Sequence, residues 1–219
     1  MKTDDGPSAL ADIAPVSRET GERLEAFVAL VRKWQRAENL VSSKTLPAIW
    51  RRHVADCAQL VPMFADARRW LDIGSGAGFP GLVVAIMLAD APGVTVHLVE
   101  SNRRKCAFLR QAIAETGAPA TVHEGRAEIV LAAWRMPIDR VVARAVAPLG
   151  KLLALAAPAL ATGAAAFHKG REFAREVDEA AQSWSFDLVV HESRIAGGGV
   201  ILDISRLARR PDLNRIIDP

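Results

Sequence analysis

The hydrophobic positions of this 219-residue chain change their spacing near residue 67. Upstream, apolar residues recur every three or four positions, the spacing of one helical face: Leu24, Phe27, Val28, Val31 and Trp34. A second helix is expected to contain Ile49, Trp50 and Val54. We therefore assign residues 18–66 to a small N-terminal helical region. We expect residues 1–17 to form a disordered or loosely attached tail.

Downstream of residue 67, short apolar runs alternate with helical segments. Strands are expected at residues 70–73, 94–100, 120–123, 138–143 and 164–168. Helices are expected at residues 80–91, 103–116, 128–134, 149–160 and 172–184. A final strand pair, 188–192 and 200–204, surrounds the glycines at 197–199. This order predicts an α/β fold at residues 67–207, with a mostly parallel sheet and an antiparallel closing strand, and leaves 208–219 as a tail.

Composition limits the possible functions without naming one. Half of the residues are hydrophobic, which is enough for a full core, and the formal net charge is only +3. The two cysteines, Cys57 and Cys106, form no close-spaced motif, which indicates a reducing compartment. No apolar run approaches the roughly 20 residues that span a bilayer, and no signal peptide is visible. We expect a cytoplasmic monomer that does not contact membranes.

The densest chemical signal is the segment LDIGSGAGFPG at residues 71–81, where an apolar run ends in an acid and four glycines follow. Glycine lets a ligand approach the backbone, so a strand, a tight turn and a helix here predict a nucleotide-cofactor site. Two templates fit. Gly76 to Gly81 matches the G-x-G-x-x-G pattern of dinucleotide-binding proteins. Asp72, Gly74, Gly76 and Gly78 match the acid-x-G-x-G-x-G pattern of S-adenosylmethionine-dependent methyltransferases.

Three observations favour S-adenosylmethionine over a dinucleotide. The carboxylate of Asp72 suits a cationic amino-acid group and would repel a pyrophosphate. A dehydrogenase needs further substrate-binding elements, but the single α/β domain is already complete by Arg206. The closing antiparallel strand also suits a seven-stranded methyltransferase sheet. Glu100, at the end of the second strand, suits the ribose diol of either cofactor and does not discriminate. A NAD-binding oxidoreductase therefore remains an alternative.

Several other residues are candidates because they follow strand ends. Ala127 and Glu128 follow the third strand, where adenine is expected, although Glu128 alone is more typical of a solvated helix start. Arg144 and Lys169 end the fourth and fifth strands, where charged residues are often functional, with surface ion pairs as the ordinary alternative. Phe79 fits packing on the cofactor and packing in the core equally well.

Metal and nucleophile chemistry have little support in the sequence. His53 and Asp56 lie one helical turn apart but have no third ligand nearby, so we expect no metal site. Gly74-Ser75-Gly76 does not match the G-x-S-x-G elbow of serine hydrolases, and we assign no catalytic residue.

Basic residues gather in two stretches despite the small net charge. Six Lys or Arg lie between Arg32 and His53, against the single acid Glu38, and Arg103-Arg104-Lys105 form a second cluster. Such clusters suit phosphate contacts, although a solvated basic helix face is common. Together they favour RNA as the partner.

Specific segments resemble a known family, in order from Trp34 to Arg206. They are Asn39-Leu40-Val41, Trp50 to Asp56, Asp72 to Gly81, Glu100 to Leu109, Gly125 to Glu128, Ala143-Arg144-Ala145 and His168-Lys169-Gly170. The chain resembles the bacterial 16S ribosomal RNA guanine-N7 methyltransferase family, also called glucose-inhibited division protein B. Cys57 stands where that family leads us to expect a serine.

The resemblance implies a Rossmann-like class I methyltransferase that modifies 16S ribosomal RNA of the small ribosomal subunit. It implies a site for S-adenosylmethionine made from Gly74, Phe79, Glu100, Ala127, Glu128 and Arg144. We expect Gly74, Gly76 and Gly78 to let the backbone of the turn approach the same cofactor. The basic residues that we expect to contact ribosomal RNA are Arg51, Arg52, His53, Arg103, Arg104 and Lys169.

The expected reaction needs no general base. Methyl transfer from a sulfonium is an in-line displacement, and N7 of guanine attacks with a free lone pair and loses no proton. The enzyme has only to align the reacting atoms and stabilise the positive charge that moves onto the base. Two further alternatives stay open: a methyltransferase for a protein or small molecule, and a non-catalytic RNA-binding module.

Overall fold

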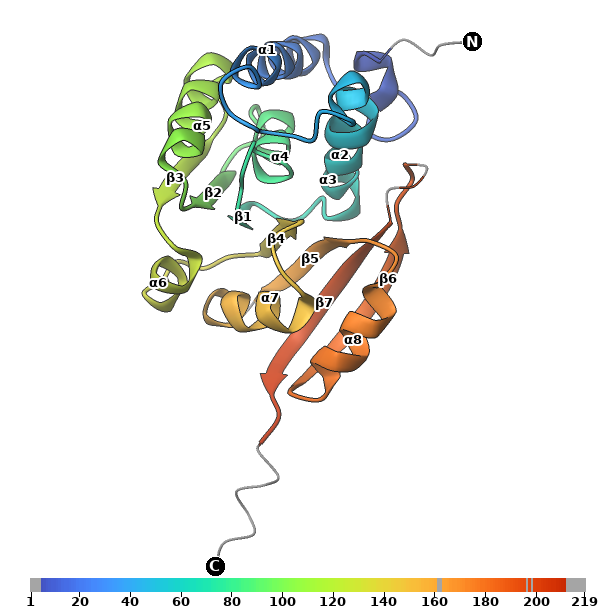
Figure 1. The fold of residues 1–219 in the computed structure, drawn as a ribbon, viewed down its shortest axis with the longest axis vertical. Helices are drawn as coiled ribbons and strands as arrows, with labels where there is room; N and C mark the ends of the chain where they lie inside the picture. Colours follow the sequence, from blue (N-terminus) through green and yellow to red (C-terminus); the bar gives the residue numbers. More distant parts are fainter. Residues whose placement is uncertain (1–4, 161–162, 196, 198, 212–219) are drawn as a thin grey trace, which may run out of the picture.

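One seven-stranded sheet organises the fold, with the strand order β3-β2-β1-β4-β5-β7-β6 (Figure 1). The computed structural model describes residues 5–160, 163–195, 197 and 199–211. The strands are β1 (Arg69–Ile73), β2 (Thr95–Glu100), β3 (Ala120–Glu124), β4 (Arg140–Arg144), β5 (Ala164–Lys169), β6 (Trp184–Glu192) and β7 (Val200–Arg209). Strands β1 to β5 pair in parallel, and β7 runs antiparallel to β5 and β6. The predicted mostly parallel sheet with an antiparallel closing strand is confirmed.

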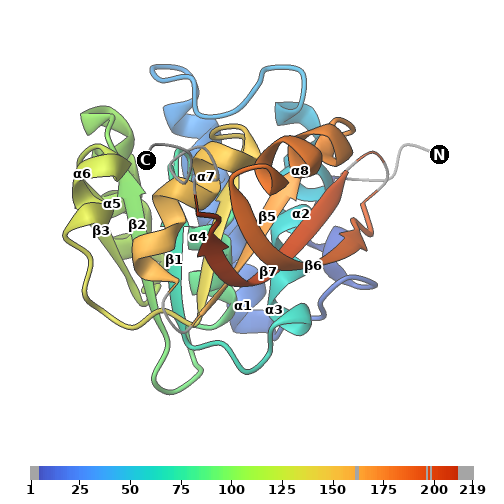
Figure 2. The ribbon, with the colours of Figure 1, turned by 90° about the horizontal axis from the view of Figure 1, so that it is seen from below.

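Helices cover both faces of the sheet (Figure 2). One face carries α1 (Arg18–Trp34), α4 (Gly81–Met87) and α5 (Arg103–Thr116). The other carries α6 (Ala127–Ala132), α7 (Leu149–Ala156), the 3₁₀ turn η4 (Ala157–Ala159) and α8 (Phe173–Ala181). Because side chains alternate along a strand, Trp70 packs into the first core and its neighbour Leu71 into the second. The central strands are therefore buried on both faces, as parallel sheets require.

The second helical segment of the N-terminal region is built from several kinds of turn. It contains η2, a 3₁₀ turn (Leu46–Ala48), η3, a π-helix (Trp50–Ala55), α2 (Asp56–Ala58) and α3 (Leu60–Met63). The expected apolar residues Ile49, Trp50 and Val54 are buried, in the same core as α1 and α4. Wider π-helical turns often occur at functional sites, and this one faces the ends of β4 and β5.

The expectation of a loose N-terminal tail is wrong for residues 5–17. The 3₁₀ turn η1 (Pro7–Leu10) places Leu10 in the core. The carboxylate of Asp5 accepts hydrogen bonds from the backbone N–H groups of Trp50 and Arg51, both at 3.2 Å. The error arose because one buried leucine gives no hydrophobic period to detect. Residues 1–4 lie outside the described part of the chain.

Two boundaries in the C-terminal third also differ from the expectation. The last helix ends at Ala181, and Trp184 begins β6 instead of ending the helix. Strand β7 extends to Arg209, so the expected tail from residue 208 starts inside the sheet. The rest of that tail, residues 212–219, lies outside the described residues. The division into separate regions remains a prediction. None of the described helices is long and apolar enough to cross a membrane.

Candidate functional site

The glycine turn after β1 leaves its backbone open to a ligand. Gly74 has a φ of +69°, and a Cβ added there would stand 2.8 Å from Cγ2 of Val146. A larger residue would therefore be strained in the backbone and would collide with the segment after β4. This explains the glycine that follows the strand, and it places Val146 directly over the turn.

Asp72 is a buried acid with one unsatisfied oxygen. Its Oδ2 accepts a hydrogen bond from the backbone N–H of Gly81, at the start of α4, over 3.0 Å. Its Oδ1 is buried and has no partner among the described residues. Burial raises the pKa of Asp72 to about 7. A cationic group beside Oδ1 would satisfy it and lower that pKa, so this residue fits a cofactor that carries an ammonium group.

Glu100 is held firmly at the end of β2. Its carboxylate accepts hydrogen bonds from three backbone N–H groups: Gly76 at 2.9 Å, Ser101 at 2.8 Å and Asn102 at 2.7 Å. A carboxylate has about four acceptor positions, so it can still accept from a diol. The bond to Gly76 joins the glycine turn to the second strand, as expected if both contact one nucleoside.

A cavity of about 280 Å³ lies beside these groups, and four of the predicted cofactor residues line it. They are Gly74, Glu100, Ala127 and Glu128. The other four lie elsewhere. Gly76 and Gly78 shape the turn, and Phe79 packs in the core, with its ring 5.3 Å from Phe27 and 5.1 Å from His53 between centroids.

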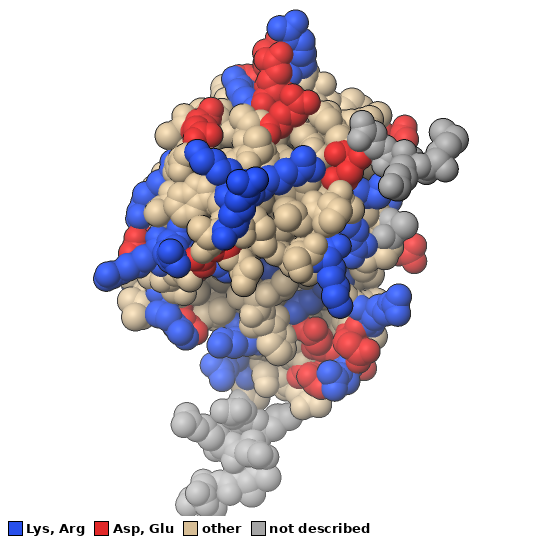
Figure 3. Space-filling model, turned by 45° about the horizontal axis from the view of Figure 1, so that its top comes forward, with Lys and Arg blue, Asp and Glu red and all other residues tan. Residues whose placement is uncertain are grey.

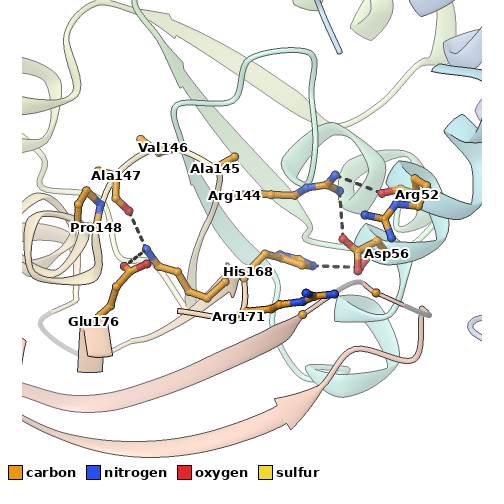
Figure 4. Close-up of a pocket in the computed structure, with 14 residues that line it drawn as sticks. Arg52, Asp56, Arg144, Ala145, Val146, Ala147, Pro148, His168, Arg171 and Glu176 are labelled. Carbon is orange, nitrogen blue, oxygen red and sulfur yellow. Dashed lines mark hydrogen bonds and ion pairs between the residues drawn. The ribbon is translucent and has the colours of Figure 1, made fainter. Parts of the chain in front are cut away.

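Arg144, the eighth predicted cofactor residue, lines a different cavity of about 660 Å³ (Figure 4). Its Nη2 donates to the carbonyl oxygen of Arg52 over 3.2 Å, and its Nη1 lies 3.2 Å from Oδ2 of Asp56. The side chain therefore points from the end of β4 toward the N-terminal helical region. This is the physical reason that Arg144 does not reach the cavity beside Glu100.

His53 is buried between Arg144 and Thr45, not exposed for RNA contact. Nη2 of Arg144 lies 2.8 Å from its Nδ1, and Oγ1 of Thr45 lies 2.8 Å from its Nε2. A guanidinium can only donate, so Nδ1 holds a lone pair and Nε2 carries the proton. Burial and the charges of Arg144 and Arg52 lower the pKa of His53 to about 4. The predicted RNA contact of His53 is not supported by this position.

Lys169 is also already paired. Its side chain is only 7% exposed, and its Nζ donates to Oε2 of Glu176 at 2.6 Å and to the carbonyl oxygen of Ala147 at 2.7 Å. Its charge is therefore matched inside the protein, which disfavours the phosphate contact expected from the sequence. Lys169 instead fixes the segment between β4 and α7.

His168 and Asp56 complete the wall between the second cavity and the helical region. Nε2 of His168 donates to the carbonyl oxygen of Asp56 over 3.0 Å. Burial lowers the pKa of His168, so the ring is neutral. Oδ1 of Asp56 accepts from Gln59 at 3.0 Å and from Ser193 at 2.9 Å. This network joins α2, β5 and the β6–β7 hairpin at the carboxyl edge of the sheet.

The remaining predicted RNA residues lie on the surface near the N-terminal helices. Arg103 and Arg104 begin α5 and are exposed, each 3.5 Å from an acid, Glu124 and Glu38 respectively. Arg51 is exposed, and Arg52 lines the larger cavity. Figure 3 shows Lys and Arg side chains across this face, with acids between them. The face is basic but not uniformly so.

Sequence reasoning missed Val146, Arg171 and Glu176, which line the larger cavity. Arg171 is exposed and makes no hydrogen bond or ion pair with the other described residues. Its position two residues beyond the end of β5 was a usable signal, since ligands bind beyond the carboxyl ends of parallel strands. Glu176 lies within a helix, and its sequence position carries no such signal.

Known proteins match nearly the whole chain. The family described as "GidB: rRNA small subunit methyltransferase G" matches residues 20–200. The "Ribosomal RNA small subunit methyltransferase G" proteins of Brucella canis and Brucella abortus are each 50% identical over 214 residues, covering 97% of this chain and 100% of theirs.

Solved structures with low sequence identity share the fold. The SAH-bound methyltransferase PaMTH1 of Podospora anserina has a TM-score of 0.57 at 15% identity, covering 88% of this chain and 97% of that one. The O-methyltransferase TomG of Streptomyces achromogenes, in complex with SAM, has a TM-score of 0.58 at 16% identity, covering 94% and 98%. The chain belongs to the rRNA small subunit methyltransferase G (GidB) family.

Proposed function

We propose that this protein methylates N7 of a guanine in 16S ribosomal RNA of the small ribosomal subunit. One observation carries the proposal: a cavity lined by Gly74, Glu100 and Glu128 adjoins a larger, arginine-lined cavity, and Val146 lines both. The first suits the methyl donor and the second suits an anionic nucleotide. Both are lined by residues of a single chain, so the proposal requires only a monomer.

The residues around the smaller cavity suit different parts of the cofactor. Asp72 would hold the ammonium group, Glu100 the ribose diol, and Ala127 and Glu128 the adenine ring. S-adenosylmethionine supplies the methyl group as a sulfonium, so transfer to N7 breaks the carbon–sulfur bond, leaves a neutral thioether and moves positive charge onto the base. No proton has to leave the acceptor, so no general base is required.

The larger cavity has room for a base that has left its stack. An enzyme that modifies a base takes it from a single-stranded region or flips it out of a helix. Arg52 and Arg171 line this cavity, and arginine suits both phosphate oxygens and O6 of guanine. Alignment of N7 with the methyl group is then the main task of the protein.

The exposed basic residues suit the RNA around the target. Arg51 lies on the π-helix next to Arg52, and Arg103 and Arg104 lie at the start of α5. Phosphate contacts from such residues position an RNA without reading its sequence. We therefore assign the choice of nucleotide to the larger cavity and the affinity for RNA to this basic face.

Methyl mapping of 16S ribosomal RNA tests the proposal. RNA from cells with and without the protein is compared for N7-methylguanine, and the purified protein is then incubated with the unmethylated RNA, free or within small subunits. We expect one N7-methylguanine to disappear without the protein and to return with it. Identical maps would contradict the proposal, and methylation at another atom would correct the acceptor. Comparing free RNA with small subunits identifies the physical substrate.

A further inference from the structure

A four-residue segment, Ala145 to Pro148, lines the larger cavity (Figure 4), and its residues Val146 and Ala147 also line the smaller one. It connects the end of β4 to the start of α7. Val146 lines both cavities and is 39% exposed, although its side chain is apolar. Its Cγ2 also lies 2.8 Å from the position that a Cβ on Gly74 would occupy. Among the described residues, this segment is therefore the only one that lines both cavities. Within it, Val146 lies against the glycine turn.

The backbone of this segment is held in a conformation that it would not adopt freely. Ala145 has a φ of +55°, in the left-handed region that residues with a Cβ seldom occupy. Such a conformation persists only where surrounding contacts impose it. The position of Val146 is thus imposed from outside the segment, and the contacts that impose it can be identified.

One carboxylate oxygen fixes both Ala147, which follows Val146, and Leu149, which begins α7. Oε2 of Glu176, on α8, accepts from the backbone N–H of Leu149 over 2.7 Å. The same oxygen accepts from Nζ of Lys169 at 2.6 Å, and Nζ donates in turn to the carbonyl oxygen of Ala147 at 2.7 Å. Glu176 therefore acts on this segment directly and through Lys169.

We propose that Val146 is a positioning residue that divides the two cavities and sets the opening through which the methyl group reaches the base. Glu176 is a second positioning residue, which holds Val146 in place through Ala147 and Leu149. The inference rests on the proposed function, since it needs the target base in the larger cavity. A branched apolar side chain at this point excludes water and keeps the base from sliding toward the nucleoside site, so N7 meets the methyl group in line.

Substitutions at Val146 test the division. Val146→Ala should lower kcat about tenfold by loosening alignment, while the Kd for S-adenosylmethionine stays within about twofold. Val146→Leu adds bulk beside the smaller cavity and should raise that Kd about tenfold. Val189→Ala and Val189→Leu, on the exposed edge strand β6, are matched controls and should change neither quantity.

The two measurements separate this inference from the proposed function. Calorimetry with S-adenosylmethionine needs no RNA, so Val146→Leu reports on the division even if the acceptor is not guanine. An unchanged Kd for Val146→Leu, or an unchanged kcat for Val146→Ala on an RNA that the parent protein methylates, would overturn the inference. Absence of RNA methylation by the parent protein would contradict only the proposed function, and the Kd would then decide alone.

A double-mutant cycle tests whether Glu176 acts through Val146. Glu176→Gln should lower kcat about tenfold in the parent protein but less than about twofold in Val146→Ala, because the alignment is already lost there. Equal losses in both backgrounds would show a role independent of Val146. Glu179→Gln, on the same helix with only a surface pair to Arg175, is the control. If Glu176→Gln does not fold, Glu176→Asp retains the charge for Lys169 and replaces it in the cycle.

Discussion

Nη1 of Arg144 lies 3.2 Å from Oδ2 of Asp56, and this ion pair joins the end of β4 to the N-terminal helical region. The side chains are 20% and 6% exposed, respectively, so the pair lies largely out of water. Oδ1 of Asp56 is already satisfied by Gln59 and Ser193. The carboxylate therefore has a partner on each oxygen, and Arg144 supplies the cation of the pair.

Removal of that charge should destabilise the fold. Arg144→Ala leaves Asp56 buried without its cation, which typically costs about 3 kcal/mol of unfolding free energy. Urea titration measures the loss, and calorimetry should show an unchanged affinity for S-adenosylmethionine, because Arg144 does not line the smaller cavity. Arg103→Ala is the control, since Arg103 is 92% exposed and its pair should contribute at most about 0.5 kcal/mol. Equal stability of the two variants would contradict the assigned role.

His53 should make stability fall in mild acid. Its folded-state pKa is lowered to about 4 from 6.5, so the unfolded chain binds more protons between these values. Its contribution is therefore complete above about pH 6.5 and is lost as the pH falls toward 4, by about 1 to 3 kcal/mol. Urea titrations at pH 7.5 and 5 should show a smaller loss for His53→Gln than for the parent protein. Other buried histidines titrate in both proteins, so only the difference between the two stability losses, parent minus variant, reports on His53. Equal losses would refute the prediction.

The parts of the site that follow from local sequence were predictable, and the parts that depend on distant contacts were not. Asp72 and Glu100 end neighbouring parallel strands, so their proximity follows from the strand order alone. Arg144 was placed correctly at a strand end, but its side-chain direction depends on Asp56, far away in sequence. The pairing of Glu176 with Lys169 depends on how α8 folds back against the end of β5, which the sequence of the helix alone does not determine.

Asp72 should couple cofactor binding to proton release. Its pKa is raised to about 7 by burial, and an ammonium group beside Oδ1 would lower it. Affinity for S-adenosylmethionine should therefore rise about eightfold from pH 6 to pH 7.5 and level off above about pH 8. At pH 6, calorimetry in buffers with different ionisation heats should detect release of about one proton. Asp72→Asn should bind more weakly with no such dependence, and a persistent pH effect in that variant would assign it to another group.

Charge reversal on the π-helix should weaken catalysis through RNA. The double variant Arg51→Glu, Arg52→Glu places acids beside the proposed RNA face and should lower methylation of RNA at least about tenfold. Affinity for S-adenosylmethionine should not change, because neither residue lines the smaller cavity. Methylation by the parent protein should itself fall steeply with added salt. Unchanged methylation by the double variant would place the RNA elsewhere on the protein.

Arg171 should bind a phosphate at the mouth of the larger cavity. It lines that cavity, is exposed, and pairs with none of the other described residues, so its guanidinium is available to an anion. Arg171→Gln should raise the KM for RNA about tenfold with a smaller change in kcat, and should reduce the slope of log affinity against log salt by about 1. Arg175→Gln is the control: it also removes one positive charge, but from α8, where Arg175 already pairs with Glu172 and Glu179. This variant should leave the KM and the salt slope unchanged. If both variants lose affinity equally, the effect reflects overall charge, and the specific contact of Arg171 is excluded.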